Sequence, residues 1–293
     1  MFKPDIQKFS EKEWKTMRIL FGIFWVHGIV NIITNFSSIP VPRGWALIID
    51  LSFLDTIPGK SIFILVALLS VIFYVKNAKM IYVTGLMFLI GICVHTYQDS
   101  QATDIYNEII NLVVLGQFLA FSYCRYFKRS AGEDVVINLV IHNSKQAIIA
   151  CYLIAAISKL SDAGLSWIID APNLSVAIYK MYMHNYVGLL SPELLSTALA
   201  YSTFIASHPL LIQVLFAIVL LAELLGIVAL VNRQLSVVVG IVLIALHFGI
   251  AYFTGIHFDH FVVLLLIFLV NIGYVVNLVL IFSKKVLSSD KSS

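Results

Sequence analysis

The chain has 293 residues, of which 60% are hydrophobic and only 12% are charged. A soluble domain usually carries about 25% charged residues, so this composition excludes an ordinary soluble globular protein and predicts an all-α, polytopic membrane helix bundle. The net charge of +3 is small, and the expected partner is the lipid bilayer rather than a nucleic acid.

Apolar segments long enough to cross a bilayer recur along the whole chain. A transmembrane helix needs about 20 mainly apolar residues. In chain order, the predicted spans are residues 16–36, 61–76, 79–97, 105–124, 146–160, 209–231, 235–255 and 259–283. They divide the chain into a cytoplasmic segment 1–15, a transmembrane domain 16–283 and a cytoplasmic tail 284–293.

The basic residues predict the orientation of these spans. With eight spans and a cytoplasmic N-terminus, only Arg43, Lys60, Lys159 and Lys180 of the 19 lysines and arginines fall outside. Cytoplasmic loops are enriched in Lys and Arg. We therefore expect a multi-pass protein of a bacterial cytoplasmic membrane with both termini in the cytoplasm.

One of the long outer segments, residues 161–208, contains two further amphipathic stretches. One covers about 173–190, and the next begins at Ser191-Pro192-Glu193, a cap residue followed by a first-turn proline and acid. Mixed polarity and several tyrosines predict helices that lie in the outer interface and cover the mouth of a polar chamber.

Ionisable side chains inside spans are costly and often mark function. Most of those found here lie at mid-membrane or in the outer half, whereas the cytoplasmic halves read as almost purely apolar. A chamber open to the outside is therefore expected. As catalytic residues we predict Lys159, Glu223 and His247. As substrate-binding residues we predict His27, Asn31, His95, Glu108, Trp167, His257, Asp259 and His260, and no metal site.

Plainer roles exist for several of these residues. His27 or Asn31 serves equally well as an interhelical hydrogen bond, and His257, Asp259 and His260 as a hydrated turn. Lys159 could be a lysine that extends to the interface from a helix end. If the Lys159 amine is partly removed from water, it would instead act as a base. In that case Lys159→Ala should abolish activity without unfolding the protein, unless the substitution leaves a charged partner unpaired.

Two stretches resemble signatures of the horizontally transferred transmembrane (HTTM) domain. Cys151–Trp167 is similar to a small-residue helix that ends in Lys-Leu and is followed by a tryptophan, although here the tryptophan lies farther along the chain than in the family. Ala245–Phe261 is similar to a histidine-bearing span that precedes a Gly-x-x-Phe turn. The overall hydropathy pattern fits over residues 11–283.

The HTTM domain forms the membrane part of vitamin K-dependent gamma-glutamyl carboxylase. The resemblance implies that Lys159 is the base that activates a reduced quinone, on a carboxylase-like or peptide-maturation route. In size the chain is similar to small bacterial members, some of which help to mature secreted peptide toxins. The expected substrate is a secreted peptide or a small hydrophobic molecule.

Two other classes of function use the same residues. In a proton-coupled transporter they would form a proton relay, although no internal repeat or mid-span proline supports this class. In a non-catalytic membrane partner or immunity protein they would only hold helices together, and single substitutions would be tolerated.

Overall fold

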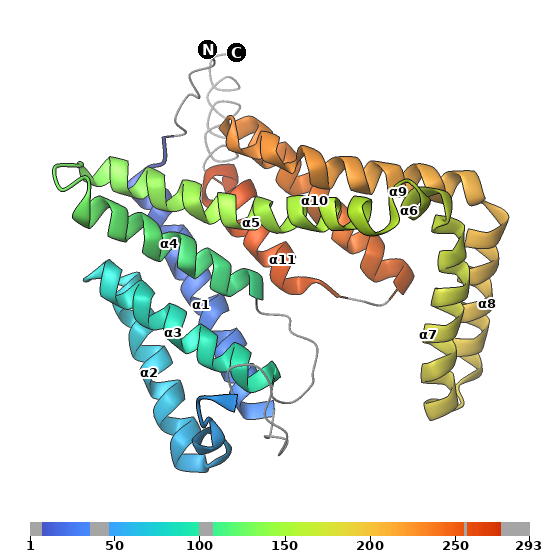
Figure 1. Ribbon diagram of the computed structural model, residues 1–293, viewed down its shortest axis with the longest axis horizontal. Coiled ribbons are helices and arrows are strands. Elements are labelled where there is room, and N and C mark those ends of the chain that lie inside the picture. The colour runs from blue at the N-terminus through green and yellow to red at the C-terminus, as the bar shows by residue number, and fades with distance from the viewer. Residues whose placement is uncertain (1–7, 36–46, 100–107, 255–256, 277–293) are drawn as a thin grey trace, which may run out of the picture.

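The computed structural model describes residues 8–35, 47–99, 108–254 and 257–276 (Figure 1). These residues form helices and connecting turns without any strand, which confirms the all-α prediction. Seven helices are long and apolar enough to cross a membrane. They are α1 (Glu11–Asn35), α2 (Ile57–Val75), α3 (Met80–Asp99), α4 (Glu108–Tyr126), α5 (Glu133–Ala163), α9 (Pro209–Leu224, continued as a 3-10 helix to Leu230) and α10 (Arg233–Thr254).

The eighth predicted span, 259–283, begins as a shorter helix. It consists of α11 (Asp259–Leu264) and a π-helical turn, Leu265–Val270. Asn271 then adopts a left-handed conformation with φ of 55°, which interrupts the helix before residues 272–276 resume it. The last part of the predicted span lies outside the described residues.

Helix α5 is twice as long as the predicted span 146–160. It covers 31 residues, or about 47 Å at 1.5 Å per residue. The charged and amide residues of its first half read as a loop in the sequence. In the structure they belong to the helix, and Ser144 and Lys145 point into the protein, with 0% and 1% of their surface exposed.

Helix α1 starts where a reciprocal cap stabilises its first turn. The Glu13 N–H donates to Ser10 Oγ (3.3 Å), and the Ser10 N–H donates to Glu13 Oε2 (2.9 Å). This pattern is a capping box, which satisfies two N–H groups that a helix end leaves without partners. Trp14, Phe21 and Trp25 then recur on one face of α1 and are buried, so this face anchors α1 in the core.

The outer surface of the bundle is apolar, as expected for contact with lipid. Helix α2 is strongly apolar, yet only 22% of its span is buried inside the protein. Large apolar side chains such as Leu65, Leu69 and Phe73 are exposed on it. Soluble monomers rarely expose apolar surface on this scale, so the described part of the chain is a multi-pass membrane protein.

Contacts between helix ends show that the chain returns to its starting side. Arg18, near the start of α1, donates to the carbonyls of Tyr74 and Val75 at the end of α2. Farther along, Glu13 pairs with Arg233 at the start of α10 and accepts a hydrogen bond from Asn271. The starts of α1 and α10 and the end of α2 therefore lie together on one side of the bundle. We call this side the Glu13 end.

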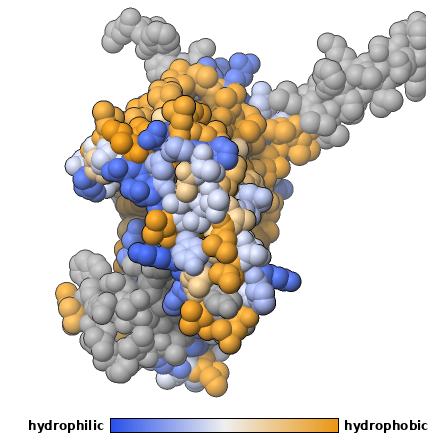
Figure 2. Space-filling view, turned by 90° about the vertical axis from the view of Figure 1, so that its right-hand side faces the viewer, coloured by the Kyte–Doolittle hydropathy of each residue, from blue (hydrophilic) through white to orange (hydrophobic). Residues whose placement is uncertain are grey.

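Between α5 and α9 the chain forms a short helix and a helical hairpin, which pack against α9. The short α6 (Ser166–Ile169) leads into an antiparallel hairpin of α7 (Leu174–Leu189) and α8 (Pro192–Ser207), which extends away from α5 (Figure 1). Each hairpin helix has 16 residues, too few to count among the apolar spans. Figure 2 shows this side of the molecule, where residues of mixed polarity lie below a strongly hydrophobic region.

The approach of α10 to residues 265–270 depends on Gly240. A Cβ built at Gly240 would lie 2.9 Å from Val270 Cγ2 and 3.0 Å from Leu269 Cβ. We expect Gly240→Ala to lower the free energy of unfolding by about 1–3 kcal/mol, because overpacking forces the backbone to shift. Gly249→Ala in the same helix meets nothing within 4 Å and is the control. Equal stabilities of the two variants, measured by unfolding in mixed micelles, would contradict this prediction.

Candidate functional site

An ion pair between α5 and α9 lies at the centre of the candidate site. Lys159 Nζ is 2.6 Å from both carboxylate oxygens of Glu223. The Lys159 side chain keeps 26% of its surface exposed, whereas that of Glu223 keeps 8%. The carboxylate is thus enclosed by the protein, and the ammonium lies between it and the surroundings.

A tryptophan covers the ammonium from the other side. Lys159 Nζ lies 5.0 Å from the centre of the Trp167 ring, a cation–π geometry. The Trp167 ring also lies 4.8 Å from the ring of Phe216 on α9. Gly164 places it there, because φ of 59° at this glycine ends α5 and turns the chain back into α6.

A second hydrogen-bonded pair joins α5 to α10. Tyr152 Oη and His247 Nε2 are 2.6 Å apart, and both side chains are buried. The His247 ring also packs against Phe258 and Phe261, at centroid distances of 5.2 and 5.4 Å. His247 Nδ1 is buried and has no hydrogen-bond partner among the described residues.

The two pairs belong to one site. Tyr152 and Lys159 are seven residues apart and therefore share a face of α5, with the buried Ala156 between them. Glu223 acts electrostatically on Tyr152, and Lys159 acts electrostatically on His247. We call Tyr152, Lys159, Glu223 and His247 the acid–base cluster.

The structure therefore unites all three predicted catalytic residues, Lys159, Glu223 and His247, with the predicted binding residue Trp167. Sequence reasoning missed Tyr152, whose position two turns before Lys159 on the same helix face was the available signal.

The other predicted site residues lie elsewhere in the bundle. His27 and Asn31 are exposed on α1, where Asn31 accepts a hydrogen bond from Asn35. His260 on α11 packs its ring 5.7 Å from that of Phe24 and interacts electrostatically with His27. These contacts tie α1 to α11 without reaching Lys159.

The remaining predicted binding residues are also separate from the cluster. Glu108, His257 and Asp259 are exposed, and His95 is half-buried on α3. Within the described residues, no hydrogen bond or ion pair joins any of them to the acid–base cluster. The described part of the chain also brings no three His, Cys, Asp or Glu side chains close enough to hold a metal ion.

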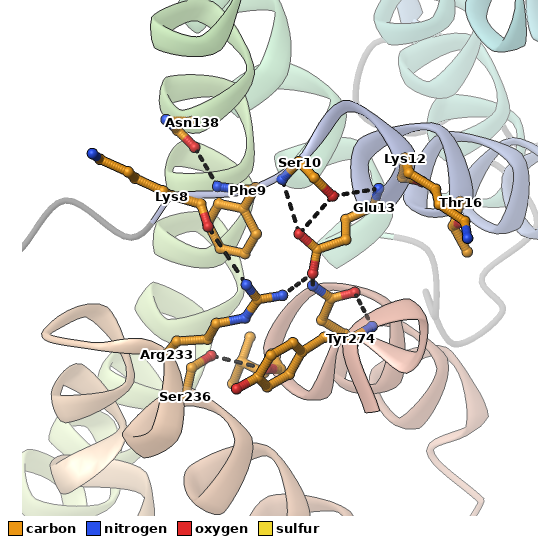
Figure 3. Close-up of polar contacts among 12 residues, drawn as sticks. Lys8, Phe9, Ser10, Lys12, Glu13, Thr16, Asn138, Arg233, Ser236 and Tyr274 are labelled. Atoms are coloured by element: carbon orange, nitrogen blue, oxygen red, sulfur yellow. Dashed lines mark hydrogen bonds and ion pairs between the residues drawn. The ribbon is translucent and has the colours of Figure 1, made fainter. Parts of the chain in front are cut away.

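The opposite side of the bundle, at the Glu13 end, is polar. In Figure 3, Arg233 reaches Glu13 and the carbonyl of Lys8, and its guanidinium lies 3.5 Å from the Tyr274 ring centre. Glu13 also accepts a hydrogen bond from Asn271 Nδ2 (3.1 Å). We call Glu13, Arg233, Asn271 and Tyr274 the Glu13 cluster.

Further polar side chains are buried near the same end. Tyr74 Oη donates to Gln117 Oε1 (2.8 Å), and Gln117 Nε2 donates to Ser144 Oγ (3.2 Å). Each of these groups is hydrogen-bonded, as burial away from water requires. The pattern indicates structural cross-links between α2, α4 and α5 rather than a second reactive site.

Comparison of the chain with protein-family models, with curated proteins and with solved structures found no match.

Proposed function

We propose that this protein is a membrane-embedded enzyme in which the acid–base cluster removes a proton from a weakly acidic hydroxyl of an apolar substrate, such as a reduced quinone. The observation that carries this proposal is the partly exposed Lys159 amine backed by the enclosed Glu223 carboxylate. The role is the one that the resemblance of Cys151–Trp167 and Ala245–Phe261 to HTTM signatures implies.

The ion pair supplies a place for the lysine proton. An ammonium cannot accept a proton, so Lys159 first has to pass its extra proton to Glu223. Across 2.6 Å this transfer converts an ion pair into two neutral groups. Removal of two charges from an apolar environment recovers the desolvation cost that opposes a buried ion pair. The neutral amine then faces the exposed side of the site, where it can accept the substrate proton.

The surrounding rings fit a flat, apolar substrate. Trp167 and Phe216 offer aromatic surface next to Lys159, and aromatic rings associate by stacked or edge-to-face contacts. The hydrogen bond between Tyr152 and His247 fixes the orientation of both rings. These residues would hold a quinol ring near Lys159 and limit the access of water.

A layer of apolar side chains beneath the site favours an enzyme over a proton-coupled transporter. On α5, Ile148 is buried between Lys145 and Tyr152, and on α10, Leu243 is buried between Ser236 and His247. Leu265 and Phe268 are equally buried in the facing turn. Such a layer separates the acid–base cluster from the polar groups at the Glu13 end.

The proposal is tested by replacing Lys159 with arginine, whose side chain cannot give up its proton to become a base. Lys159→Arg retains the positive charge, but guanidinium stays protonated, so we expect proton abstraction to fall at least about 100-fold, the lower bound for general-base catalysis. The measurement uses protein in lipid nanodiscs and a naphthol whose neutral and anionic forms absorb at different wavelengths, followed by oxygen uptake with a reduced naphthoquinone. Lys180→Arg, an exposed lysine on α7, is the control.

Full activity in Lys159→Arg would show that Lys159 acts only as a counter-ion to Glu223. Absence of the naphthol anion and of oxygen uptake with the unchanged protein would instead support a non-catalytic membrane partner.

A further inference from the structure

Two adjoining depressions lie where α3 begins and α4 ends, away from the acid–base cluster. Their volumes are about 510 and 870 Å³, and Tyr82 and Arg125 line both. Lys79 also lines the larger depression, and Tyr126, Lys128 and Arg129 also line the smaller one.

The charges that line these depressions are all positive. Lys79, Arg125, Lys128 and Arg129 are exposed, and none of the four forms an ion pair with a described residue. No Asp or Glu is among the lining residues. The nearest carboxylates in sequence, Glu133 and Asp134, begin α5 and form no ion pair with these cations. Four like charges in one place favour an anion strongly over a neutral ligand.

The backbone adds to this positive potential. Residues 79–82, which line the second depression, include the first turn of α3, a helix of 20 residues. The first N–H groups of a helix have no partner within it, and the helix dipole places partial positive charge there. Phosphate groups bind at such helix starts when cations are also present.

The position of the depressions matches the headgroup layer of a membrane. Helices α3 and α4, of 20 and 19 residues, each have the length needed to cross about 30 Å of hydrocarbon, so the start of α3 and the end of α4 reach the membrane surface. Tyr82 and Tyr126 are largely exposed there, and tyrosine is enriched at that depth.

We propose that these depressions bind the phosphate of an anionic phospholipid headgroup, with Arg125 shared between the two and the acyl chains lying along the exposed apolar face of α3. Basic pockets between transmembrane helices recognise anionic headgroups by this combination of cations and interfacial position. The site, which we call the headgroup site, is independent of the proposed enzymatic function.

The test compares lipid binding to two matched double variants. Arg125→Gln/Arg129→Gln removes two charges from the headgroup site. Lys12→Gln/Lys15→Gln removes two charges from exposed positions at the start of α1 and serves as the control. Binding of phosphatidylglycerol and of phosphatidylcholine to the detergent-solubilised full chain is measured by native mass spectrometry. Thermal unfolding of each variant verifies that it folds.

We expect the unchanged protein and the control to bind phosphatidylglycerol in preference to phosphatidylcholine. Each Lys or Arg near a membrane surface strengthens binding of anionic lipid roughly fivefold, so the Arg125/Arg129 variant should bind phosphatidylglycerol about 30-fold more weakly and phosphatidylcholine unchanged. Equal loss in both double variants would overturn the site, because it would reflect total charge alone. Displacement of phosphatidylglycerol by millimolar inorganic phosphate would show a free-anion site instead of a lipid site.

Discussion

Replacement of Lys159 by methionine should lower the free energy of unfolding by about 3–5 kcal/mol, more than replacement of its partner Glu223 by glutamine. Removal of one member of a buried ion pair leaves the other charge without compensation. Glu223 is the more enclosed member, with 8% of its side chain exposed against 26% for Lys159. A remaining lysine can extend toward water, whereas a remaining carboxylate at this position cannot.

A double variant separates this loss from a change in packing. Lys159→Met/Glu223→Gln removes both charges, so its stability should recover toward that of Glu223→Gln alone. Lys180→Met and Glu193→Gln, which change exposed residues of the α7–α8 hairpin, control for the loss of any single charge. Unfolding is followed by circular dichroism in mixed micelles, and a double variant less stable than Lys159→Met would show that the pair has no energetic coupling of this kind.

Replacement of Glu13 by alanine should cost about 3 kcal/mol of stability, because one carboxylate serves two roles. It closes the capping box with Ser10 at the start of α1, a contribution of roughly 1 kcal/mol. It also accepts hydrogen bonds from Arg233 and Asn271, which join α1 to α10 and to the chain after α11. Loss of the carboxylate leaves Arg233 with only the carbonyl of Lys8 as an acceptor and removes the acceptor of the buried Asn271 amide.

Glu11→Ala is the matched control for this substitution. Glu11 is exposed and begins the same helix two residues earlier, so its replacement should change stability by less than about 0.5 kcal/mol. Similar losses in the two variants, measured in the same micelles, would mean that Glu13 acts only through the charge of the first turn and that the Glu13 cluster does not hold the bundle together.

Most helices were predictable from the length of their apolar segments, and the parts of helices that were missed are rich in polar residues. Lipid leaves no alternative to a helix for a long apolar segment, so residues such as those of α2 and α10 could be assigned directly. The first half of α5 was missed because polar residues such as Asn143 and Lys145 read as a loop. In the structure they face neighbouring helices, where Asn143 donates to the carbonyl of Gly116 and Lys145 is buried. The sequence alone does not show which side of a helix faces the interior.

The candidate site was partly predictable for a related reason. Lys159, Glu223 and His247 stand out because an ionisable residue in an apolar run has to find a partner. The identity of the partners depends on how α5, α9 and α10 cross, which no spacing along the chain specifies. Depth was misleading for His27 and Asn31, since equal depth does not place residues on facing helices. The distribution of basic residues placed Glu13 and Arg233 in hydrated cytoplasmic segments, although the two side chains form an ion pair within the protein.

The contact between Glu13 and Arg233 joins residues that are 220 positions apart, and this separation sets an order of events during synthesis. At about 5–20 residues per second, a ribosome needs roughly 10 to 40 seconds to reach Arg233 after Glu13 has emerged. Throughout this interval the carboxylate of the first helix has only its own capping residue as a partner and has to stay hydrated at the edge of the insertion machinery. The contact that joins α1 to α10 therefore forms late in synthesis, and a chain arrested before α10 would leave Glu13 without Arg233 and Asn271.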